Sequence, residues 1–169
     1  MLIRFLRHAI TLPVILVIVL VIPVSAANKP TITISSLNIS SEIKEFRLSD
    51  GTWTISPWEK GIGHLEKTGW FDNPTNIVLA GHSTMPDGKP GVFGALDTLS
   101  IGQDIVLFDG NADRHYQVTE IEIVPVDDVS VVMPTDQERL TLITCEIASY
   151  DEASQGYTQR LVVIADRVS

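Results

Sequence analysis

The sequence predicts an all-β domain, either a barrel or a sandwich. After residue 28 the chain is a series of short runs, alternating or continuous in apolar residues, of the kind that form strands. Turn-forming groups such as SDG, DNP, MPDGKPG and DGN separate these runs. No stretch after residue 28 keeps an i, i+3, i+4, i+7 apolar pattern beyond about two turns, which argues against a helical domain.

Individual strands follow from the local pattern. The run 37–43 (LNISSEI) alternates apolar and polar residues, and 115–126 does so over most of its length. The run 76–82 (NIVLAGH) is continuously apolar until it is closed by Gly81 and His82. The other expected strands are 103–108, 130–133, 139–145 and 159–168, and short helical turns are expected at 57–61 and 92–96.

Length and charge limit the class of protein. A chain of 169 residues fits one domain with a short appendage, and 44% hydrophobic residues are enough for a packed core. The formal net charge is −9, and no cluster of Lys and Arg offsets it. This balance argues against a nucleic-acid partner, because a phosphate backbone is bound mainly by cations.

The N-terminus differs in composition from the rest. Arg4 and Arg7 precede an almost wholly apolar run from Ala9 to Val24, a pattern typical of a secretory signal or an uncleaved signal anchor. VSAA at 24–27 favours cleavage, whereas a helix over 9–27 would span roughly 28 Å, close to the hydrocarbon thickness of a bilayer. Both interpretations stay open and the anchor is favoured. In either case residue 28 onward would be translocated.

We therefore expect three parts, which are 1–27 as cytoplasmic flank and signal segment, 28–36 (NKPTITISS) as a linker, and 37–169 as the folded domain. The chain has one cysteine, Cys145, and so no disulfide partner for it. A lone thiol in a translocated domain is either a small buried apolar residue or a functional group.

The neighbourhood of Cys145 favours the functional alternative. If strands 139–145 and 159–168 pair antiparallel, the end of the first lies beside the start of the second, so Cys145 and Arg160 become neighbours. Alternation places Cys145 on the face opposite to the core leucines of its strand. A thiol beside a permanent cation is in an environment that favours the reactive thiolate.

Of the four histidines, His82 is the candidate for proton transfer, because it lies where an apolar strand meets a loop. Spacing alone does not show that it reaches Cys145. His8, His64 and His115 are interpreted as structural or solvated. The aromatic residues Trp53, Trp58, Trp70 and Phe93 are interpreted as core or loop packing.

Three motifs in order, NIVLAGH at 76–82, TLITC at 141–145 and QRLVV at 159–163, resemble the sortase family. GIGHLEKTG at 61–69 and PGVFGALDTLSIGQDI at 90–105 extend the resemblance over roughly residues 37–168. The resemblance implies an eight-stranded β-barrel with short helical turns, preceded by one N-terminal membrane anchor. It also implies a single-pass protein of the bacterial cell membrane whose transpeptidase domain is extracytoplasmic.

The family pattern assigns roles to matching residues. Cys145 would attack the carbonyl before the scissile bond of an LPxTG-like sorting signal and form a thioacyl-enzyme. His82 would exchange protons with the leaving and incoming amines, and Arg160 would hold the substrate and stabilise the oxyanion. The candidate substrate-binding residues are Ala80, Ile143 and Thr144.

No cofactor is expected. Calcium sites occur in some members of the family, and Asp127, Asp128 and Glu138 would be the candidate ligands, but acidic loops are usually only solvated. The implied partners are secreted proteins with a C-terminal sorting signal and an amine acceptor such as a peptidoglycan precursor or a pilin lysine. No DPF-like or DPW-like lid precedes the barrel, which disfavours a lidded pilin polymerase and leaves the subclass open.

Two alternatives remain at this point. One is an enzyme of the same fold that acts mainly as a hydrolase. The other is a non-catalytic anchored β-barrel that binds peptide or glycan, with Cys145 buried and inert. A papain-like peptidase is disfavoured, because here His82 precedes Cys145 and no N-terminal domain helix is expected.

Overall fold

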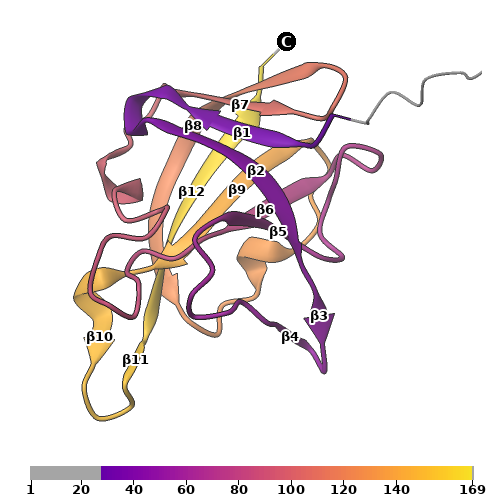
Figure 1. Cartoon of the computed structure of the whole chain (residues 1–169). Coiled ribbons are helices and arrows are strands. Elements are labelled where there is room, and N and C mark those ends of the chain that lie inside the picture. The colour runs from indigo at the N-terminus through magenta and orange to yellow at the C-terminus, as the bar shows by residue number, and fades with distance from the viewer. Residues whose placement is uncertain (1–27, 169) are drawn as a thin grey trace, which may run out of the picture.

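A computed structural model describes residues 28–168, in which eight strands close into a barrel (Figure 1). Their order around the barrel is β1-β2-β5-β6-β9-β12-β8-β7, with β2–β5 and β6–β9 parallel and the other pairs antiparallel. The predicted all-β eight-stranded barrel is confirmed. The barrel strands are β1 (Thr31–Ile34), β2 (Ile39–Phe46), β5 (Ile62–Leu65), β6 (Asn76–Ala80), β7 (Asp104–Phe108), β8 (Asp113–Pro125), β9 (Arg139–Cys145) and β12 (Gln159–Arg167).

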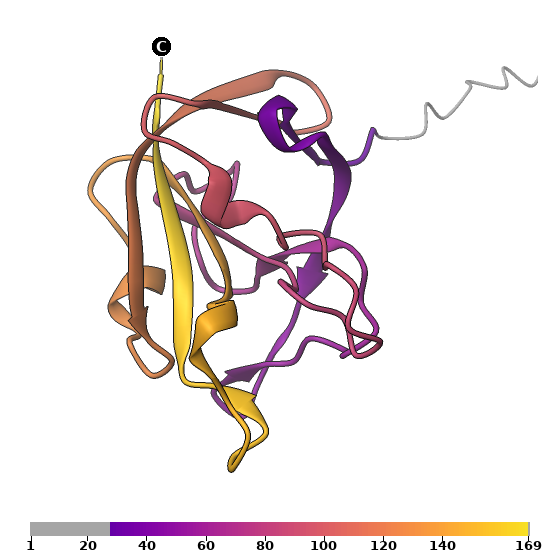
Figure 2. The same ribbon diagram turned by 90° about the vertical axis from the view of Figure 1, so that its left-hand side faces the viewer.

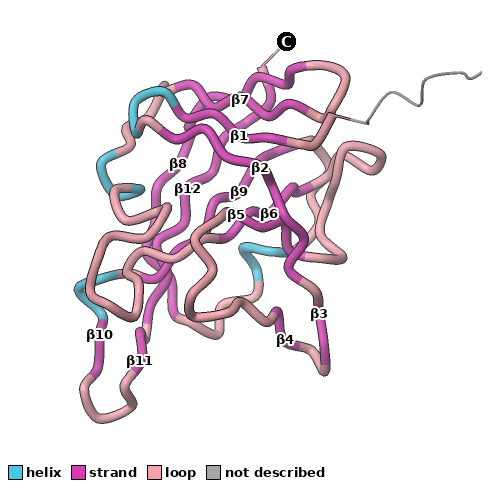
Figure 3. The backbone as a smooth tube through the Cα atoms, viewed as in Figure 1, coloured by secondary structure: helices cyan, strands magenta, loops and turns pink. Residues whose placement is uncertain are grey.

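Two small hairpins project from one end of the barrel, as Figures 1 and 2 both show. They are formed by β3 (Leu48–Ser49) with β4 (Thr52–Trp53) and by β10 (Tyr150–Asp151) with β11 (Gly156–Tyr157). Within residues 28–168, helical structure is limited to single 3₁₀ turns in the connections, coloured cyan in Figure 3. These turns are η1 (Ser35–Leu37), η2 (Leu96–Thr98), η3 (Ser130–Val132) and η4 (Ile147–Ser149).

Across residues 28–168, none of the helices has the length and apolar character needed to span a bilayer. The predicted signal anchor falls on residues 1–27, outside the described residues.

The region 28–36, expected to be a linker, instead contains a barrel strand. β1 pairs with β2 on one side and with β7 on the other, which closes the barrel. Its two isoleucines, Ile32 and Ile34, are fully buried, so the linker prediction for this part is wrong. The alternating run TITI is only four residues long, too short to stand out from the polar residues on both sides. The sequence also did not predict β5. It has only four residues and all of them are buried, so buried and exposed positions do not alternate along it.

The strand expected at 130–133 is also wrong, because residues 130–132 form the turn η3. The carboxylate of Asp128 accepts hydrogen bonds from the Ser130 amide at 2.9 Å and from its hydroxyl at 2.6 Å, and these contacts start the turn. The turn lies over the outer face of β6, where the Asn76 amide donates to the carbonyls of Val131 and Met133. Of the expected helical turns, 57–61 contains no helix and 92–96 is displaced to η2.

The interior is filled mainly by aliphatic side chains. Leu140 and Leu142 of β9 are fully buried among them, as their parity predicts. Thr141 points to the opposite face, where it is also buried, because η3 covers that face and its hydroxyl donates to Asn76 Oδ1 at 2.6 Å. The covered face makes β6 and β9 a rigid support for the residues that follow them.

His64 lies in the barrel wall. It is 7% exposed, its ring stacks on Trp70 with centroids 4.1 Å apart, and its Nε2 bonds the Gly69 carbonyl at 2.9 Å. A carbonyl oxygen only accepts, so Nε2 carries the hydrogen in this bond. Burial lowers the pKa of His64, and the Gly69 contact opposes this only in part.

We expect His64 to make the protein acid-sensitive. Because its folded pKa is depressed, the unfolded chain binds the proton first, and the free energy of unfolding falls as pH drops below about 6.5. Replacing His64 by Gln should flatten this fall between pH 7.5 and 5.5, measured as the urea midpoint. The exposed His115, changed to Gln, is the matched control and should leave the slope unchanged. An unaltered slope in the His64 variant would show that other groups cause the acid sensitivity.

Candidate active site

Cys145 and Arg160 are direct cross-strand partners. Strands β9 and β12 pair antiparallel, and the register places Arg160 opposite Cys145 at the end where β9 stops and β12 starts. This confirms the pairing predicted from the two sequence runs. The two side chains therefore leave the sheet at the same rim of the barrel.

His82 is brought to the same rim by a parallel pair. β6 runs beside β9 with Ala80 opposite Ile143, so the chain leaves both strands at one end of the barrel. The Gly81 amide donates to the Ile143 carbonyl at 3.3 Å, and the Thr144 hydroxyl donates to the Gly81 carbonyl at 2.8 Å. These bonds tie the segment that carries His82 to the segment that carries Cys145.

A groove of about 500 Å³ joins the three residues. Cys145, His82 and Arg160 all line it, and the candidate substrate-binding residues Ala80, Ile143 and Thr144 line it as well. The hydroxyl of Thr144 is already engaged with Gly81, which leaves mainly its backbone and methyl group to face the groove. The sequence-derived candidates thus converge on one cavity.

The remaining walls come from segments that the sequence did not single out. The β3–β4 hairpin supplies Trp53, whose indole Nε1 is fixed by donating to the Glu66 carbonyl at 2.9 Å. The loop 126–132 supplies Val126, Asp128, Val129, Val131 and Val132. Of these, Val129 is 63% exposed. Apolar side chains left exposed at one cavity indicate a binding surface. The sequence feature that could have indicated this wall is the group of valines in the loop 126–132 (VDDVSVV), beside two aspartates.

The His82 ring is held by the loop that follows β4. Its Nε2 bonds the Ser56 carbonyl at 2.9 Å, and because that oxygen only accepts, Nε2 carries the hydrogen. Nδ1 is then the nitrogen left to exchange a proton with a reacting group. Within residues 28–168 no hydrogen bond links His82 to Cys145, so any proton transfer between them needs a substrate or a small movement.

Burial and the charge of Arg160 act on the pKa of the Cys145 thiol in opposite directions. Burial raises its pKa, and the nearby Arg160 charge lowers it by less, so the pKa lies above the ordinary value of a cysteine. The sequence led us to expect a cation-stabilised thiolate. The cation is present as expected, but desolvation has the larger effect on the pKa of the thiol.

We expect the pH dependence of thiol alkylation to report this balance. The rate of reaction with uncharged iodoacetamide should reach half-maximum at a higher pH in the folded protein than in the urea-unfolded protein. Arg160→Gln should move the folded midpoint higher still, because it removes the opposing charge. Arg167→Gln, at the other end of β12, is the control. A folded midpoint below the unfolded one would contradict the dominance of burial.

Arg160 is positioned by backbone carbonyls of the residues just before it, and its charge remains available. The guanidinium donates to the carbonyls of Tyr157 at 3.3 Å and Gln159 at 3.1 Å. In the part of the chain that the structure describes, no carboxylate forms an ion pair with it. A surface ion pair is therefore not what holds this residue, and its remaining donors can face a bound carbonyl or oxyanion.

Two of the three carboxylates considered for calcium, Glu138 and Asp128, have other contacts. Glu138 accepts hydrogen bonds from Tyr116 at 2.6 Å and from Arg114 at 3.0 Å, and Asp128 caps Ser130. Among residues 28–168, no three His, Cys, Asp or Glu side chains are grouped closely enough to hold a metal ion.

Comparison with known proteins identifies the fold and its relatives. A family model described as "Sortase domain" matches residues 32–168. The Bacillus subtilis (strain 168) protein YwpE is 37% identical over 93 residues, which cover 55% of this chain and 83% of the relative. Sortase D of the same strain is 31% identical over 93 residues, which cover 54% of this chain and 44% of the relative.

A solved structure gives the same architecture. The Sortase D5 transpeptidase of Clostridium perfringens superimposes with a TM-score of 0.66 at 23% sequence identity, over 84% of this chain and 79% of that chain. At this level of identity the likeness concerns the fold.

Proposed function

The chain belongs to the sortase family, and we propose that it is an extracytoplasmic cysteine transpeptidase that cleaves an LPxTG-like sorting signal. The observation that carries this proposal is the convergence of Cys145, His82 and Arg160 on one groove. A nucleophile, a proton carrier and a permanent cation are the set that acyl transfer through a thioester needs.

In the first step the Cys145 sulfur attacks the carbonyl carbon of the scissile peptide bond. The C–S bond forms first and gives a tetrahedral intermediate, and the C–N bond breaks when this intermediate collapses. The proton released by the thiol passes through His82 to the departing amine. Arg160 donates to the oxygen that becomes negative in the tetrahedral intermediate. Because burial raises the pKa of the thiol, removal of its proton is a step that His82 would assist.

In the second step an amine attacks the thioester carbonyl and gives its proton to His82, and the Cys145 thiol is regenerated. Thiol, imidazole and guanidinium together supply the nucleophile, the proton transfer and the oxyanion stabilisation, so we propose no cofactor. Residues 1–27 would hold the domain at the outer face of the cell membrane. The partners are then secreted proteins with a C-terminal sorting signal and an amine acceptor at the cell surface.

The groove lining supports an apolar side chain as one determinant of substrate recognition. Val126, Val129, Val131 and Val132 face it from the loop 126–132, and Ile143 faces it from β9. An apolar residue two or more positions before the scissile bond would bury its side chain there.

Product analysis tests the proposal. The full chain is incubated with a fluorescent LPxTG-type or LAxTG-type peptide and hydroxylamine or triglycine, and the products are separated by mass spectrometry. We expect cleavage after Thr and transfer to the added amine. Release of only the free acid would indicate the hydrolase alternative. No cleavage of any such peptide, with Cys145 still alkylated readily, would overturn the proposal.

His82 should carry most of the acid–base contribution. His82→Ala is expected to lower kcat/KM by on the order of a hundredfold or more, the usual scale for a general acid–base group. His64→Ala and His115→Ala should keep most of the activity of the folded fraction, because neither lines the groove. If His64→Ala were the inactive variant and His82→Ala the active one, the assignment of the proton carrier would be wrong.

A further inference from the structure

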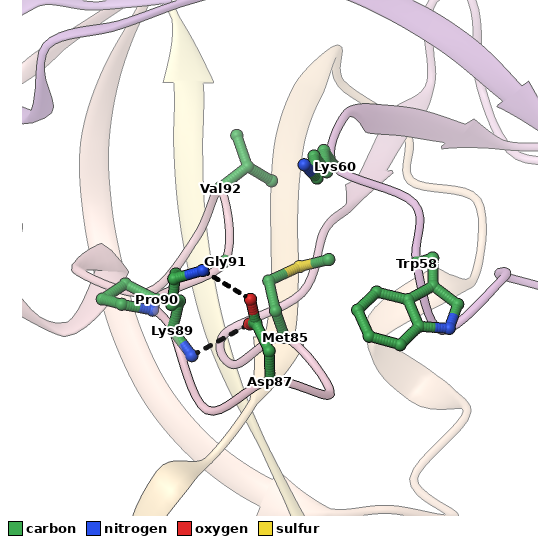
Figure 4. A pocket seen from close by; sticks show the side chains of 8 residues that line it. All are labelled: Trp58, Lys60, Met85, Asp87, Lys89, Pro90, Gly91 and Val92. Carbon is green, nitrogen blue, oxygen red and sulfur yellow. Dashed lines mark hydrogen bonds and ion pairs between the residues drawn. The ribbon is translucent and has the colours of Figure 1, made fainter.

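A second cavity, of about 280 Å³, lies close to the groove and shares no lining residue with it. Its walls are the segment 58–60 and the loop 85–92, which face each other across the opening (Figure 4). We call it the loop pocket. Neither the family motifs nor the roles assigned above make use of it.

The loop pocket is built from the two segments that hold His82. The Ser56 carbonyl that binds the imidazole lies two residues before Trp58. On the other wall the Gly91 amide donates to the Ser83 carbonyl at 2.8 Å. Gly91 packs so closely on the His82 backbone that a Cβ at this position would overlap the His82 carbonyl oxygen. His82 therefore lies between the groove, which its side chain lines, and the pocket wall, which its backbone contacts.

The loop pocket is lined by both apolar and charged side chains. Trp58 is 62% exposed, which corrects its interpretation as a packing residue, and Met85 and Val92 extend an apolar surface. Lys89 is paired with Asp87 at 2.7 Å, whereas Lys60 has no ion pair in the described part of the chain. The Lys89 hydrogen bond is the main reason that the pKa of Asp87 is lowered, and Lys60 adds to the effect.

One carboxylate and two lysines leave the pocket with a net positive charge, in a chain whose formal net charge is −9. Such a pocket complements a ligand with a carboxylate and a short apolar or peptide-like body. The exposed indole can cover that body, and Lys60 can bind the carboxylate.

Reaction chemistry indicates which ligand this is. The leaving amine and the incoming amine both exchange a proton with His82, so both have to approach from its side of the thioester. We propose that the loop pocket binds the amine acceptor of the transfer step, an amino-acid or peptide amine that carries a carboxylate. This inference rests on the proposed function and specifies the second substrate of the same reaction.

The kinetic test compares two acceptors that differ only in a carboxylate, triglycine and triglycine amide. Lys60→Gln should raise the KM for triglycine about three- to fivefold, the scale of an exposed charge pair, and leave that for the amide unchanged. Trp58→Ala should raise the KM for both about five- to tenfold, because apolar contact area is lost. Formation of the acyl-enzyme should be unaffected in both variants. Lys67→Gln, an exposed lysine outside the pocket, is the matched control.

A binding measurement separates the pocket from the chemistry. Titrating triglycine onto the isotope-labelled full chain should shift the NMR signal of the Trp58 indole and of residues 85–92, and Lys60→Gln should weaken this response. If these shifts occur but no sorting peptide is cleaved, the site stands and the proposed function fails. If peptides are cleaved and transferred, yet Trp58 does not shift and both variants keep wild-type KM values, the inference is overturned.

Discussion

Cys145→Ala is expected to abolish peptide cleavage while leaving the fold intact. The loss should be complete within detection, because no other side chain in the groove can form the thioester. Stability should change little, since Cys145 is only half-buried at the rim and the core leucines of β9 are untouched. Steady-state cleavage assays and thermal unfolding followed by circular dichroism measure the two parts of the expectation separately.

Cys145→Ser adds a sharper comparison. It keeps a nucleophilic atom at the same position but offers an alcohol, whose proton is much less acidic than that of a thiol. We expect activity far below wild type and no adduct with thiol reagents. Substantial turnover by the alanine variant would remove Cys145 from the mechanism, and a collapse of the fold in both variants would mean that its contribution is structural.

Arg160→Lys should lose most of the activity, with the larger part of the loss in kcat. Arginine offers several donors in a rigid fork, two of which are directed to the Tyr157 and Gln159 carbonyls, and the others remain for the substrate. Lysine keeps the charge but holds it on a mobile ammonium. Loss of one oxyanion donor typically costs about 3–4 kcal/mol of transition-state stabilisation, or roughly a hundred- to a thousandfold in rate.

The distinction between kcat and KM carries the argument for Arg160. An interaction made only in the transition state lowers kcat, whereas uniform substrate binding appears mainly in KM. Steady-state comparison of wild type, Arg160→Lys and Arg160→Ala separates the two, and Arg167→Lys at the far end of β12 is the control. Near-normal kcat in Arg160→Lys would reduce Arg160 to a positive charge near the substrate.

Short apolar runs, some of them alternating with polar residues, predicted the strands that bear the site. β9 has the bounds 139–145 expected from its sequence, and its pairing with β12 in the register that joins Cys145 to Arg160 follows from antiparallel geometry. Elements that depend on tertiary packing were not predictable in this way. β1 and β5 have four residues each, and the apolar run at 130–133 became a turn because Asp128 and Asn76 offered its backbone better partners.

In the candidate site too, some features could be predicted from the sequence and others depend on tertiary packing. Cys145, Arg160 and His82 could be named from the ends of strands, and the parallel pairing of β6 with β9 brings them to one rim. The direction of the pKa shift of the thiol could not be predicted from the sequence, because it depends on how far the surrounding residues exclude water. Trp53 of the groove and Trp58 of the loop pocket were also missed, since aromatic residues in irregular segments usually indicate packing.

Trapping the acyl-enzyme tests the central claim most directly. The full chain is mixed with an LPxTG-type or LAxTG-type peptide without an added amine, quenched in acid within one turnover, and analysed by intact-mass and peptide-fragment mass spectrometry. The account predicts an adduct on Cys145 whose mass equals the peptide up to Thr less one water, absent in Cys145→Ala and released on addition of triglycine. Efficient peptide cleavage without any adduct on Cys145 would contradict it.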